Sequence, residues 1–427
     1  MNFLRKAYNI LNNQKLFSLY DKFFCKIRTK GFLGLINDSY FKKLIRDKKW
    51  LKASKVGEKL VSQYHSDINN RRNLARCYWE LHEYKLASKA LKLDMSLEDI
   101  VLKSKAQIPV ATEFIESKYL NLGGKKNLGI IEHKSKLRAE MYYTKISLKS
   151  DNEKLFYKEI YRTFGSKIQS ITPKILSINY IEQDNITLVT TEKVEGKRPD
   201  TVSRSLLDSV IRINNVITSI RYKDINNLIE QPDFNTEFKL FSDRKPRNPR
   251  VLLKSFIAIH KREANEKLFR LIYERMHKLQ HSIESIKLIK RLESIILSSK
   301  IYEKLEPEVH YSILHGDFGK DNLLNNRKEE KLYIIDWGSF RTGPSWVDIV
   351  NIMVNLKLSF TEIKVYYLSN SEAYFEDRNI EQIFFLYTIL VAWFITMSKD
   401  EFDKQHENYL KPAINYLEDL ILTVKYS

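Results

Sequence analysis

The sequence predicts an α+β protein in which helices come first, a strand-rich segment follows, and a larger helical segment completes the chain. Three observations support this order. Apolar side chains recur at helical spacing over much of residues 1–105, three runs between Glu113 and Leu148 read as strands, and residues 200–310 are again largely helical. We therefore expect an all-α region of helical hairpins at 1–105, a small β-rich domain at 106–196 and a larger helical domain at 197–427.

Composition limits the classes of function that fit. The chain has 427 residues, 43% of them apolar, with only 12 Gly and 9 Pro, so it can bury a sizeable core and has no low-complexity composition. Its two cysteines, Cys25 and Cys77, give neither a disulfide framework nor a zinc site and fit a reducing cytosol. The formal net charge of +19 indicates a phosphate-rich ligand, nucleic acid or an anionic membrane as partner, unless it reflects genomic base bias. Because no nucleic-acid-binding motif accompanies the charge, we do not expect nucleic acid.

The first 35 residues have a basic amphipathic pattern. Seven Lys and Arg side chains between Arg5 and Lys30 oppose a single acid, Asp21, and aromatic residues follow the apolar face. Such a helix either lies on an anionic membrane or packs on its neighbours with a solvated basic face. No cleavable signal peptide is evident, and the most apolar run, Ile383–Met397, has 15 residues and is too short to span a bilayer. We expect a cytoplasmic protein, with peripheral contact at the inner face of a membrane as the alternative.

A repeat follows the basic segment. Phe41–Gly57 and Ala75–Leu91 align when one is moved by 34 residues, which superposes the identical Ala53-Ser54-Lys55 and Ala87-Ser88-Lys89. Thirty-four residues is the period of tetratricopeptide repeats, which place a small Ala where paired helices approach closely. The alternative is an ordinary antiparallel helical hairpin. A repeat module of this kind holds a protein partner or braces another domain.

The strand-rich segment carries two features suited to phosphate groups. Its predicted strands are Glu113–Leu120, Leu128–His133 and Ala139–Leu148. Between the first two, Gly123 and Gly124 permit close approach of the backbone to phosphates, although most such pairs are simply turns. In the third, alternation puts Lys145 on the same face as Met141 and Tyr143, where a lysine needs an anion to meet.

The stretch from His315 to Asp348 carries the chemistry. Leu323-Leu324 and Leu332–Ile335 read as strands joined by a polar turn, so this hairpin brings Asp336 back beside Asn322 and Asp317. A carboxylate and an amide oxygen suit Mg²⁺, and a second carboxylate can orient a hydroxyl and accept its proton. The alternative is a polar hairpin whose Asp and Asn residues only make turns.

The spacing of these residues resembles a known superfamily. His-Gly-Asp-x-x-x-x-Asn at His315–Asn322, followed by Ile335-Asp336-Trp337, resembles the catalytic loop and metal-binding strand end of aminoglycoside phosphotransferases and choline kinases. The resemblance implies a two-lobed, protein-kinase-like fold that binds ATP. It implies that Asp317 is the catalytic base, that Asn322 and Asp336 hold Mg²⁺, that His315 shapes the loop, and that Asp348 braces it by hydrogen bonds.

The resemblance also implies roles for residues upstream. Lys145 would contact the α- and β-phosphates, with Lys149 as a competitor, and Glu159 in the predicted helix Asp151–Phe164 would pair with that lysine, with Glu153 as a competitor. The family's glycine-containing loop corresponds to Gly123-Gly124. Thr172–Ile175 would lead into a strand at Ile186–Thr191, and the hinge between lobes would follow, marked by Glu192 and Val194.

Together these patterns predict an ATP- and Mg²⁺-dependent phosphotransferase that acts on a hydroxyl of a small molecule or sugar. The basic charge and the helical extension suggest an acceptor in cell-surface glycan biosynthesis, such as lipopolysaccharide or capsule. Two alternatives remain open: a non-catalytic kinase-fold scaffold that binds protein partners, and an aminoglycoside or choline kinase. The basic, proline-containing segment 243–250 is either a clasp for an anionic substrate or a solvated linker.

Overall fold

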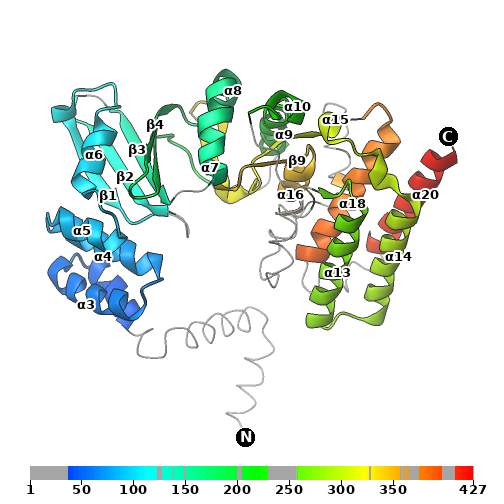
Figure 1. The fold of residues 1–427 in the computed structure, drawn as a ribbon, viewed down its shortest axis with the longest axis horizontal. Helices are drawn as coiled ribbons and strands as arrows, with labels where there is room; N and C mark the ends of the chain where they lie inside the picture. The colour runs from blue at the N-terminus through cyan, green and yellow to red at the C-terminus, as the bar shows by residue number, and fades with distance from the viewer. Residues whose placement is uncertain are drawn as a thin grey trace, which may run out of the picture. The chain divides into compact units, whose positions relative to one another are not determined.

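The computed structural model divides the chain into two compact units (Figure 1). One comprises Met1–Ser150 and Lys174–Lys193, and the other Asp151–Pro173 and Val194–Ser427. The structure describes residues 37–122, 127–137, 139–148, 151–199, 204–228, 256, 258–326, 328–355, 358, 361–362, 365, 375–396 and 409–426. The basic N-terminal segment, Gly123, Gly124, Lys149 and the segment 243–250 therefore lie outside the described residues.

The first unit contains a five-stranded antiparallel sheet of order β1-β2-β3-β5-β4. Its strands are β1 (Ile115–Leu120), β2 (Asn127–Ser135), β3 (Met141–Leu148), β4 (Ile175–Ile181) and β5 (Ile186–Glu192). The expectation that Thr172–Ile175 leads directly into the strand at 186 is wrong, because β4 comes between them. Nearly all residues of this edge strand are half-buried, so it lacks the alternation that would have revealed it.

Helices precede the sheet in the same unit. They are a helix at 37–46, α3 (Trp50–Gln63), α4 (Ile68–Glu80), α5 (Tyr84–Leu91) and α6 (Leu97–Lys105), followed by the 3₁₀ turn η1 (Thr112–Phe114). Asp67 caps α4 and Ser96 caps α6, each through its side chain, as polar N-cap residues commonly do. Ala53 and Ala87, the equivalent residues of the repeat, are both completely buried. The helices thus pack closely at the small residues that the 34-residue spacing singles out.

The helices and the sheet share one hydrophobic core. Leu97 and Ile100 of α6 belong to the same cluster of buried side chains as Tyr119, Ile131 and Ile146 of the sheet. The helical region 37–105 is therefore part of the unit that contains the sheet, whereas the sequence suggested a division at residue 105. The helices cover one face of the sheet, since the buried residues of β3 alternate with half-buried ones.

The second unit is largely helical. It contains α7 (Asp151–Leu155), the π-helix η2 (Phe156–Ile160), α8 (Tyr161–Ile168), α9 (Arg204–Thr218), α10 (Tyr222–Ile225), α13 (Arg262–Lys278), α14 (Ile283–Ser299), the 3₁₀ helix η4 (Ile301–Lys304), α15 (Pro307–His310), α16 (Val347–Asn355), α18 (Arg378–Thr396) and α20 (Lys411–Tyr426). Two small antiparallel ribbons complete it: β6 (Tyr311–Leu314) with β9 (Arg341–Pro344), and β7 (Leu323–Asn326) with β8 (Lys331–Ile334). A β-rich unit and a largely helical unit confirm the predicted α+β class.

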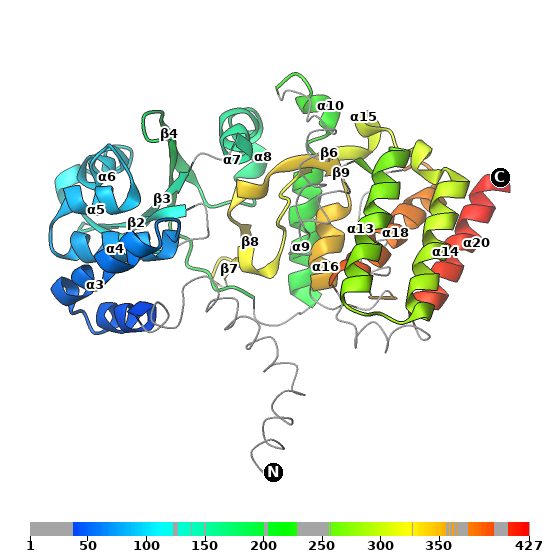
Figure 2. The same ribbon diagram turned by 60° about the horizontal axis from the view of Figure 1, so that its bottom comes forward.

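The helices α13, α14, α18 and α20 pack together in this unit, as both ribbon views show (Figures 1 and 2). α18 is buried on all sides between Ile383 and Phe394, so this part of the most apolar run of the chain lies in the core. Within it, the Tyr387 hydroxyl donates to the buried Asn265 amide oxygen at 2.9 Å. In the part of the chain that the structure describes, no helix combines the length and apolarity needed to cross a bilayer.

Candidate active site

The predicted catalytic loop begins where β6 ends. All four residues of β6 are buried, and they are followed by His315, also buried, and by Gly316 in the left-handed conformation with φ +74°. The loop closes on itself because Asn322 Nδ2 donates to the Asp317 carbonyl oxygen at 2.8 Å. The 3₁₀ turn η5 (Lys320–Asn322) lies between them. Asp317 is half-buried at the start of this loop.

The hairpin of β7 and β8 brings Asp336 beside this loop. Leu323 pairs with Ile334, and one step further the Ile335 N–H donates to the Asn322 carbonyl oxygen at 2.9 Å. Asp336 is the next residue; it is exposed and has a φ of +68°. Asn322 is therefore bonded to Asp317 on one side and, on the other, to the residue that precedes Asp336. The 3₁₀ turn η6 (Trp337–Ser339) follows them.

His315 holds the loop and the hairpin together. Its ring accepts the Asp317 N–H at Nδ1 (3.4 Å), and its Nε2 donates to the Ile335 carbonyl oxygen (3.0 Å). These partners select the tautomer with the proton on Nε2. Burial lowers the pKa of His315 to about 4, so the ring is neutral near pH 7. These are the contacts of a residue that shapes the loop, which is the role that the resemblance implies for His315.

Asp348 at the start of α16 binds the other side of the loop. Its carboxylate accepts the His315 N–H at 2.5 Å and the Gly316 N–H at 3.1 Å. Burial raises the pKa of Asp348 to about 6, although the two N–H donors and the Arg341 guanidinium oppose the shift. Arg341, itself buried, donates to the Ser339 carbonyl oxygen at 3.2 Å and to the Gly316 carbonyl oxygen at 3.3 Å. The loop is thus held from two directions by groups of opposite charge.

The two candidate glutamates of the helical segment 151–168 have different surroundings. Glu159 pairs with its neighbour Lys158 at 3.4 Å and keeps 27% of its side chain exposed. Glu153 is only 3% exposed, and its Oε2 lies 3.8 Å from the point that a Cβ on Gly338 would occupy. An Asp336 oxygen lies 3.4 Å from that same point. The structure therefore places Glu153, and not the predicted Glu159, beside the residues that follow Asp336.

Aromatic packing fixes this helical segment to the hairpin. Phe156 stacks on Trp337 with ring centroids 4.0 Å apart and an angle of 6° between the planes, and Trp337 in turn meets the His315 ring edge-on at 4.8 Å. Both Phe156 and Trp337 are buried. The sequence contained Trp337 within its Ile-Asp-Trp motif but gave no sign of its partner.

The remaining candidates lie upstream. Lys145 is half-buried in β3 of the first unit, opposite Ile130 of β2 and Val189 of β5. Glu192 ends β5 and pairs with Lys174 at 3.2 Å, and Val194 is the first residue of the second unit after it. The boundary between the two compact units therefore falls within the predicted hinge. Gly123 and Gly124 are not among the described residues.

The donor set fits magnesium. Asn322 uses its amide nitrogen within the loop, so its amide oxygen is the atom it can offer a cation, and Asp336 adds a carboxylate. Among the described residues no group of three or more His, Cys, Asp or Glu is arranged to hold a metal ion. In phosphoryl-transfer sites Mg²⁺ is typically coordinated by one or two protein oxygens, and its remaining ligands are water and substrate phosphates.

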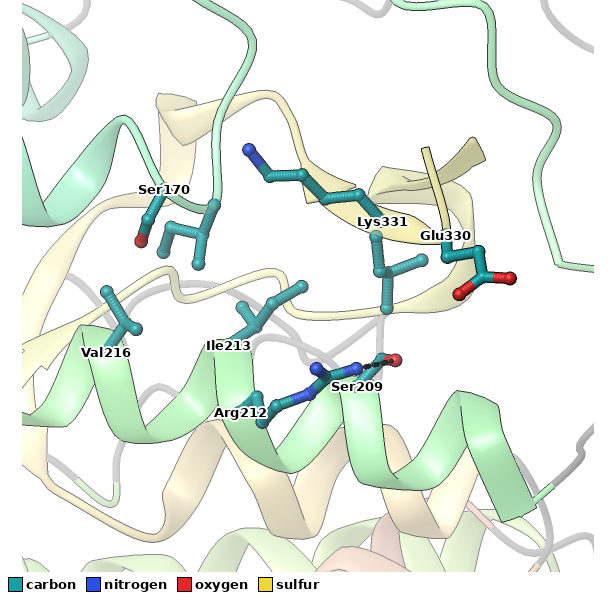
Figure 3. A pocket seen from close by; sticks show the side chains of 9 residues that line it. Ser170, Ser209, Arg212, Ile213, Val216, Glu330 and Lys331 are labelled. Atoms are coloured by element: carbon teal, nitrogen blue, oxygen red, sulfur yellow. Dashed lines mark hydrogen bonds between the residues drawn. The ribbon is translucent and has the colours of Figure 1, made fainter. Parts of the chain in front are cut away.

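A separate pocket of about 300 Å³ lies at the Lys331 end of β8, the end opposite Asp336 (Figure 3). Arg212 and Ser209 of α9 line it and are joined by a 2.8 Å hydrogen bond, while Lys331 and Ser170 line it from other segments. Its apolar lining consists of Ile171, Ile213, Val216 and Leu332. None of the predicted site residues contributes to it.

Comparison with known proteins finds a matching family for part of the chain. Residues 171–379 match the family described as "Phosphotransferase enzyme family". This match agrees with the resemblance seen in the catalytic loop and with a phosphotransferase activity. No curated protein matches the chain significantly.

Several solved structures are similar to the chain. Spectinomycin phosphotransferase in complex with ADP and spectinomycin is 13% identical with a TM-score of 0.44, over 78% of this chain and 99% of that one. Choline kinase from Streptococcus pneumoniae is 15% identical with a TM-score of 0.39 (76% and 98%), and ethanolamine kinase from Plasmodium vivax is 14% identical with a TM-score of 0.44 (88% and 95%). Because these identities and TM-scores are low, the mechanism below rests on the residues of this chain.

Proposed function

Because residues 171–379 match the phosphotransferase enzyme family, we propose that this chain transfers the γ-phosphate of ATP to a hydroxyl of a small molecule or sugar. The observation that carries the proposal is a pair of backbone-anchored contacts, which join Asn322 to the Asp317 carbonyl oxygen and to Ile335, the residue before Asp336. Phosphoryl transfer requires groups that position a nucleophile and a phosphate chain. Two carboxylates and an amide on one rigid loop and hairpin are such groups.

Each residue has a defined task in this proposal. Asp317 orients the acceptor hydroxyl and takes its proton, and the closed loop keeps the carboxylate in place. Asn322 and Asp336 would hold Mg²⁺, which neutralises charge on the phosphates when bound. His315 stays neutral and holds the loop against the hairpin, so it does not exchange protons with the substrate near pH 7. In the first unit, Lys145 would contact the nucleotide phosphates, and backbone groups near Glu192 and Val194 would bind the adenine edge.

For the acceptor we propose a sugar that carries anionic groups, as in cell-surface glycan biosynthesis. The support is the formal net charge of +19, which favours anionic over cationic ligands. An aminoglycoside or choline is the second candidate class, and it would require a local acidic pocket. The buried, equivalent Ala53 and Ala87 support a tetratricopeptide-like packing of the first helices, which we propose as a surface for a protein partner.

The deciding experiment measures ATP–Mg²⁺ binding by calorimetry and ATP consumption with a panel of sugars, aminoglycosides and choline. Asp317→Ala should lower turnover by about 10²- to 10⁴-fold while ATP–Mg²⁺ still binds, since it removes a general base and no phosphate contact. Asp321→Ala is the matched control, because Asp321 is an exposed carboxylate in the same loop. Failure of the wild-type chain to bind ATP–Mg²⁺ or to turn over any acceptor would favour the non-catalytic scaffold.

A further inference from the structure

The pocket at the start of β8 lies within the second unit and has a mixed lining. Its walls come from the turn after α8, from α9, and from the first residues of β8 with the turn before them. Three buried side chains and the half-buried Val216 form its apolar part: Ile171, Ile213 and Leu332. Its volume of about 300 Å³ is roughly twice that of a cavity that holds benzene, so a ring with one substituent fits.

Two cationic side chains line the pocket from different walls, Arg212 on α9 and Lys331 on β8. Among the described residues neither of them pairs with a carboxylate. The Lys331 ammonium lies over the Tyr333 ring, 4.5 Å from its centroid. Arg212 Nη2 donates to Ser209 Oγ at 2.8 Å, which uses one of the five N–H donors of the guanidinium. Cations in this state, beside an apolar surface, attract an anionic group.

Glu330 also lines the pocket, and its carboxylate would repel an anion. Figure 3 shows that the Glu330 side chain and the Lys331 side chain extend in opposite directions, with the Lys331 ammonium on the side of Ser170. An anionic group beside Lys331 is therefore directed away from the Glu330 carboxylate. Two cations against one carboxylate also leave the lining with a positive charge.

One backbone hydrogen bond joins the pocket to the hairpin of β7 and β8. The carbonyl oxygen of Ile171, a lining residue, accepts the Ile334 N–H at 2.7 Å. Ile334 lies two residues before Asp336 and on the same strand as Leu332, another lining residue. A ligand that packs on Ile171 and Leu332 thus covers the two segments that this bond joins, and it opposes their separation while it is bound.

We propose that this pocket binds a small molecule that combines one anionic group with an apolar body, and that the bound molecule stabilises the strand leading to Asp336. The inference goes beyond the proposed function, because none of the lining residues has a task in phosphoryl transfer. Both parts of the ligand are needed. An inorganic anion leaves the apolar lining uncovered, and an uncharged ring leaves Lys331 without a counter-charge.

The test titrates the full chain with phenyl phosphate, followed by NMR, and uses inorganic phosphate and benzyl alcohol as the anionic and apolar halves of this probe. We expect phenyl phosphate to bind with a Kd of about 1 mM or tighter, and at least about tenfold more tightly than either half. An excess of ATP–Mg²⁺ should not displace it. Absence of binding, equal affinity for inorganic phosphate, or displacement by ATP–Mg²⁺ would each overturn the inference.

Two variants change the pocket in different ways. Lys331→Gln removes a charge, and Val216→Phe fills the apolar part from a half-buried position on α9. Each should weaken binding of phenyl phosphate by at least about tenfold. Lys167→Gln is the matched control, because Lys167 is an exposed cation of α8 that does not line the pocket, and it should bind within about twofold of wild type. Wild-type affinity in either pocket variant would contradict the proposed site.

Hydrogen exchange of the Ile334 amide tests the link to the hairpin. At about ten times its Kd, phenyl phosphate should slow this exchange about tenfold, because opening of the bond to Ile171 then requires release of the ligand. Val216→Phe should show no slowing at the same concentration. Unchanged exchange in the wild-type chain with the probe bound would overturn the stabilisation of the strand. These readouts need no ATP, so a chain that fails to bind ATP–Mg²⁺ would overturn the proposed function and not this inference.

Discussion

The carboxylate of Asp348 accepts the backbone N–H of His315 at 2.5 Å, across 33 residues of sequence. This contact joins the beginning of α16 to the loop that carries Asp317. Since the same carboxylate accepts the Gly316 N–H at 3.1 Å, two consecutive peptide groups of the loop depend on one buried side chain.

Replacing Asp348 should therefore disturb stability and activity together. Asp348→Ala leaves two buried N–H groups without their acceptor, at a cost of about 1–3 kcal/mol for each in the free energy of unfolding. The loop would then lose its fixed orientation, and kcat should fall by at least about tenfold. Denaturant unfolding and steady-state ATP turnover measure the two effects. Asp348→Asn, which keeps one acceptor oxygen, should be milder, and equal behaviour of Asp348→Ala and wild type would contradict this account.

Gly316 and Gly319 offer a matched pair in the same loop. Gly316 has a φ of +74°, and a Cβ there would lie 2.1 Å from the Ser339 carbonyl oxygen. A Cβ on Gly319 would meet its nearest atom, the Asp317 carbonyl oxygen, at 4.0 Å. Gly316→Ala should therefore reduce folded yield or abolish turnover, while Gly319→Ala should keep both. Thermal unfolding and turnover of the purified variants give the readout, and a fully active Gly316→Ala would exclude the clash.

The two glutamates of the segment 151–168 should differ in importance. Glu153 is buried beside Gly338, and a buried carboxylate must have partners that stabilise its charge. Glu159 makes an exposed pair with Lys158, a type of pair that contributes little. We expect Glu153→Gln to lower kcat/KM for ATP by about tenfold or more, equivalent to roughly 1.4 kcal/mol, and Glu159→Gln to change it by less than about twofold. A larger loss of kcat/KM in Glu159→Gln than in Glu153→Gln would identify Glu159 as the functional residue.

Acid should destabilise the fold between about pH 6.5 and pH 4. Burial lowers the pKa of His133, His260 and His315 to about 4. In this window the unfolded chain binds a proton at each histidine and the folded chain does not. The buried His133 and His315 therefore each contribute a loss of about 1.4 kcal/mol per pH unit as the pH falls, and the half-buried His260 contributes less. Asp348 acts in the opposite direction, because its raised pKa of about 6 lets the folded state bind a proton first. Burial lowers the pKa of His310 as well, so four histidines against one carboxyl leave a net loss of stability on acidification.

Denaturant unfolding at pH 7.5 and pH 5 tests this balance. His133→Gln should reduce the pH dependence of the free energy of unfolding by about one proton, since it removes one of these histidines. His133 bonds to Ser117 at 2.7 Å and to Thr144 at 2.9 Å, which a glutamine amide can partly replace. Equal stability at the two pH values would show that the histidines are not held neutral in the folded chain.

Much of the fold could be predicted because its signals are local. The predicted ends of β1, β2, β3 and β5 lie within about two residues of the observed ends. They could be predicted because each strand has a continuous apolar or alternating run. The edge strand β4 was missed because its residues are half-buried and carry no period. The meeting of Asn322 with Asp336 was also predictable, because a hairpin of two short strands connects them.

Other parts of the site were beyond the reach of any pattern in the sequence. Nothing distinguished Glu153 from Glu159, because both are single acids in a charged helix and only packing against Gly338 separates them. The stacking of Phe156 on Trp337 likewise joins two segments that no motif relates.

The sequence by itself determined the class of chemistry, because the residues that carry it lie within one loop and one hairpin whose geometry is set by local turns and pairing. The tertiary structure alone decided what holds that loop and which helix contacts the start of β2. Arg72 and Asn127 are 55 residues apart, and His315 and Asp348 are 33 apart. Contacts over such separations form only when packing of the whole unit brings the chains together, and the sequence carries no local sign of them.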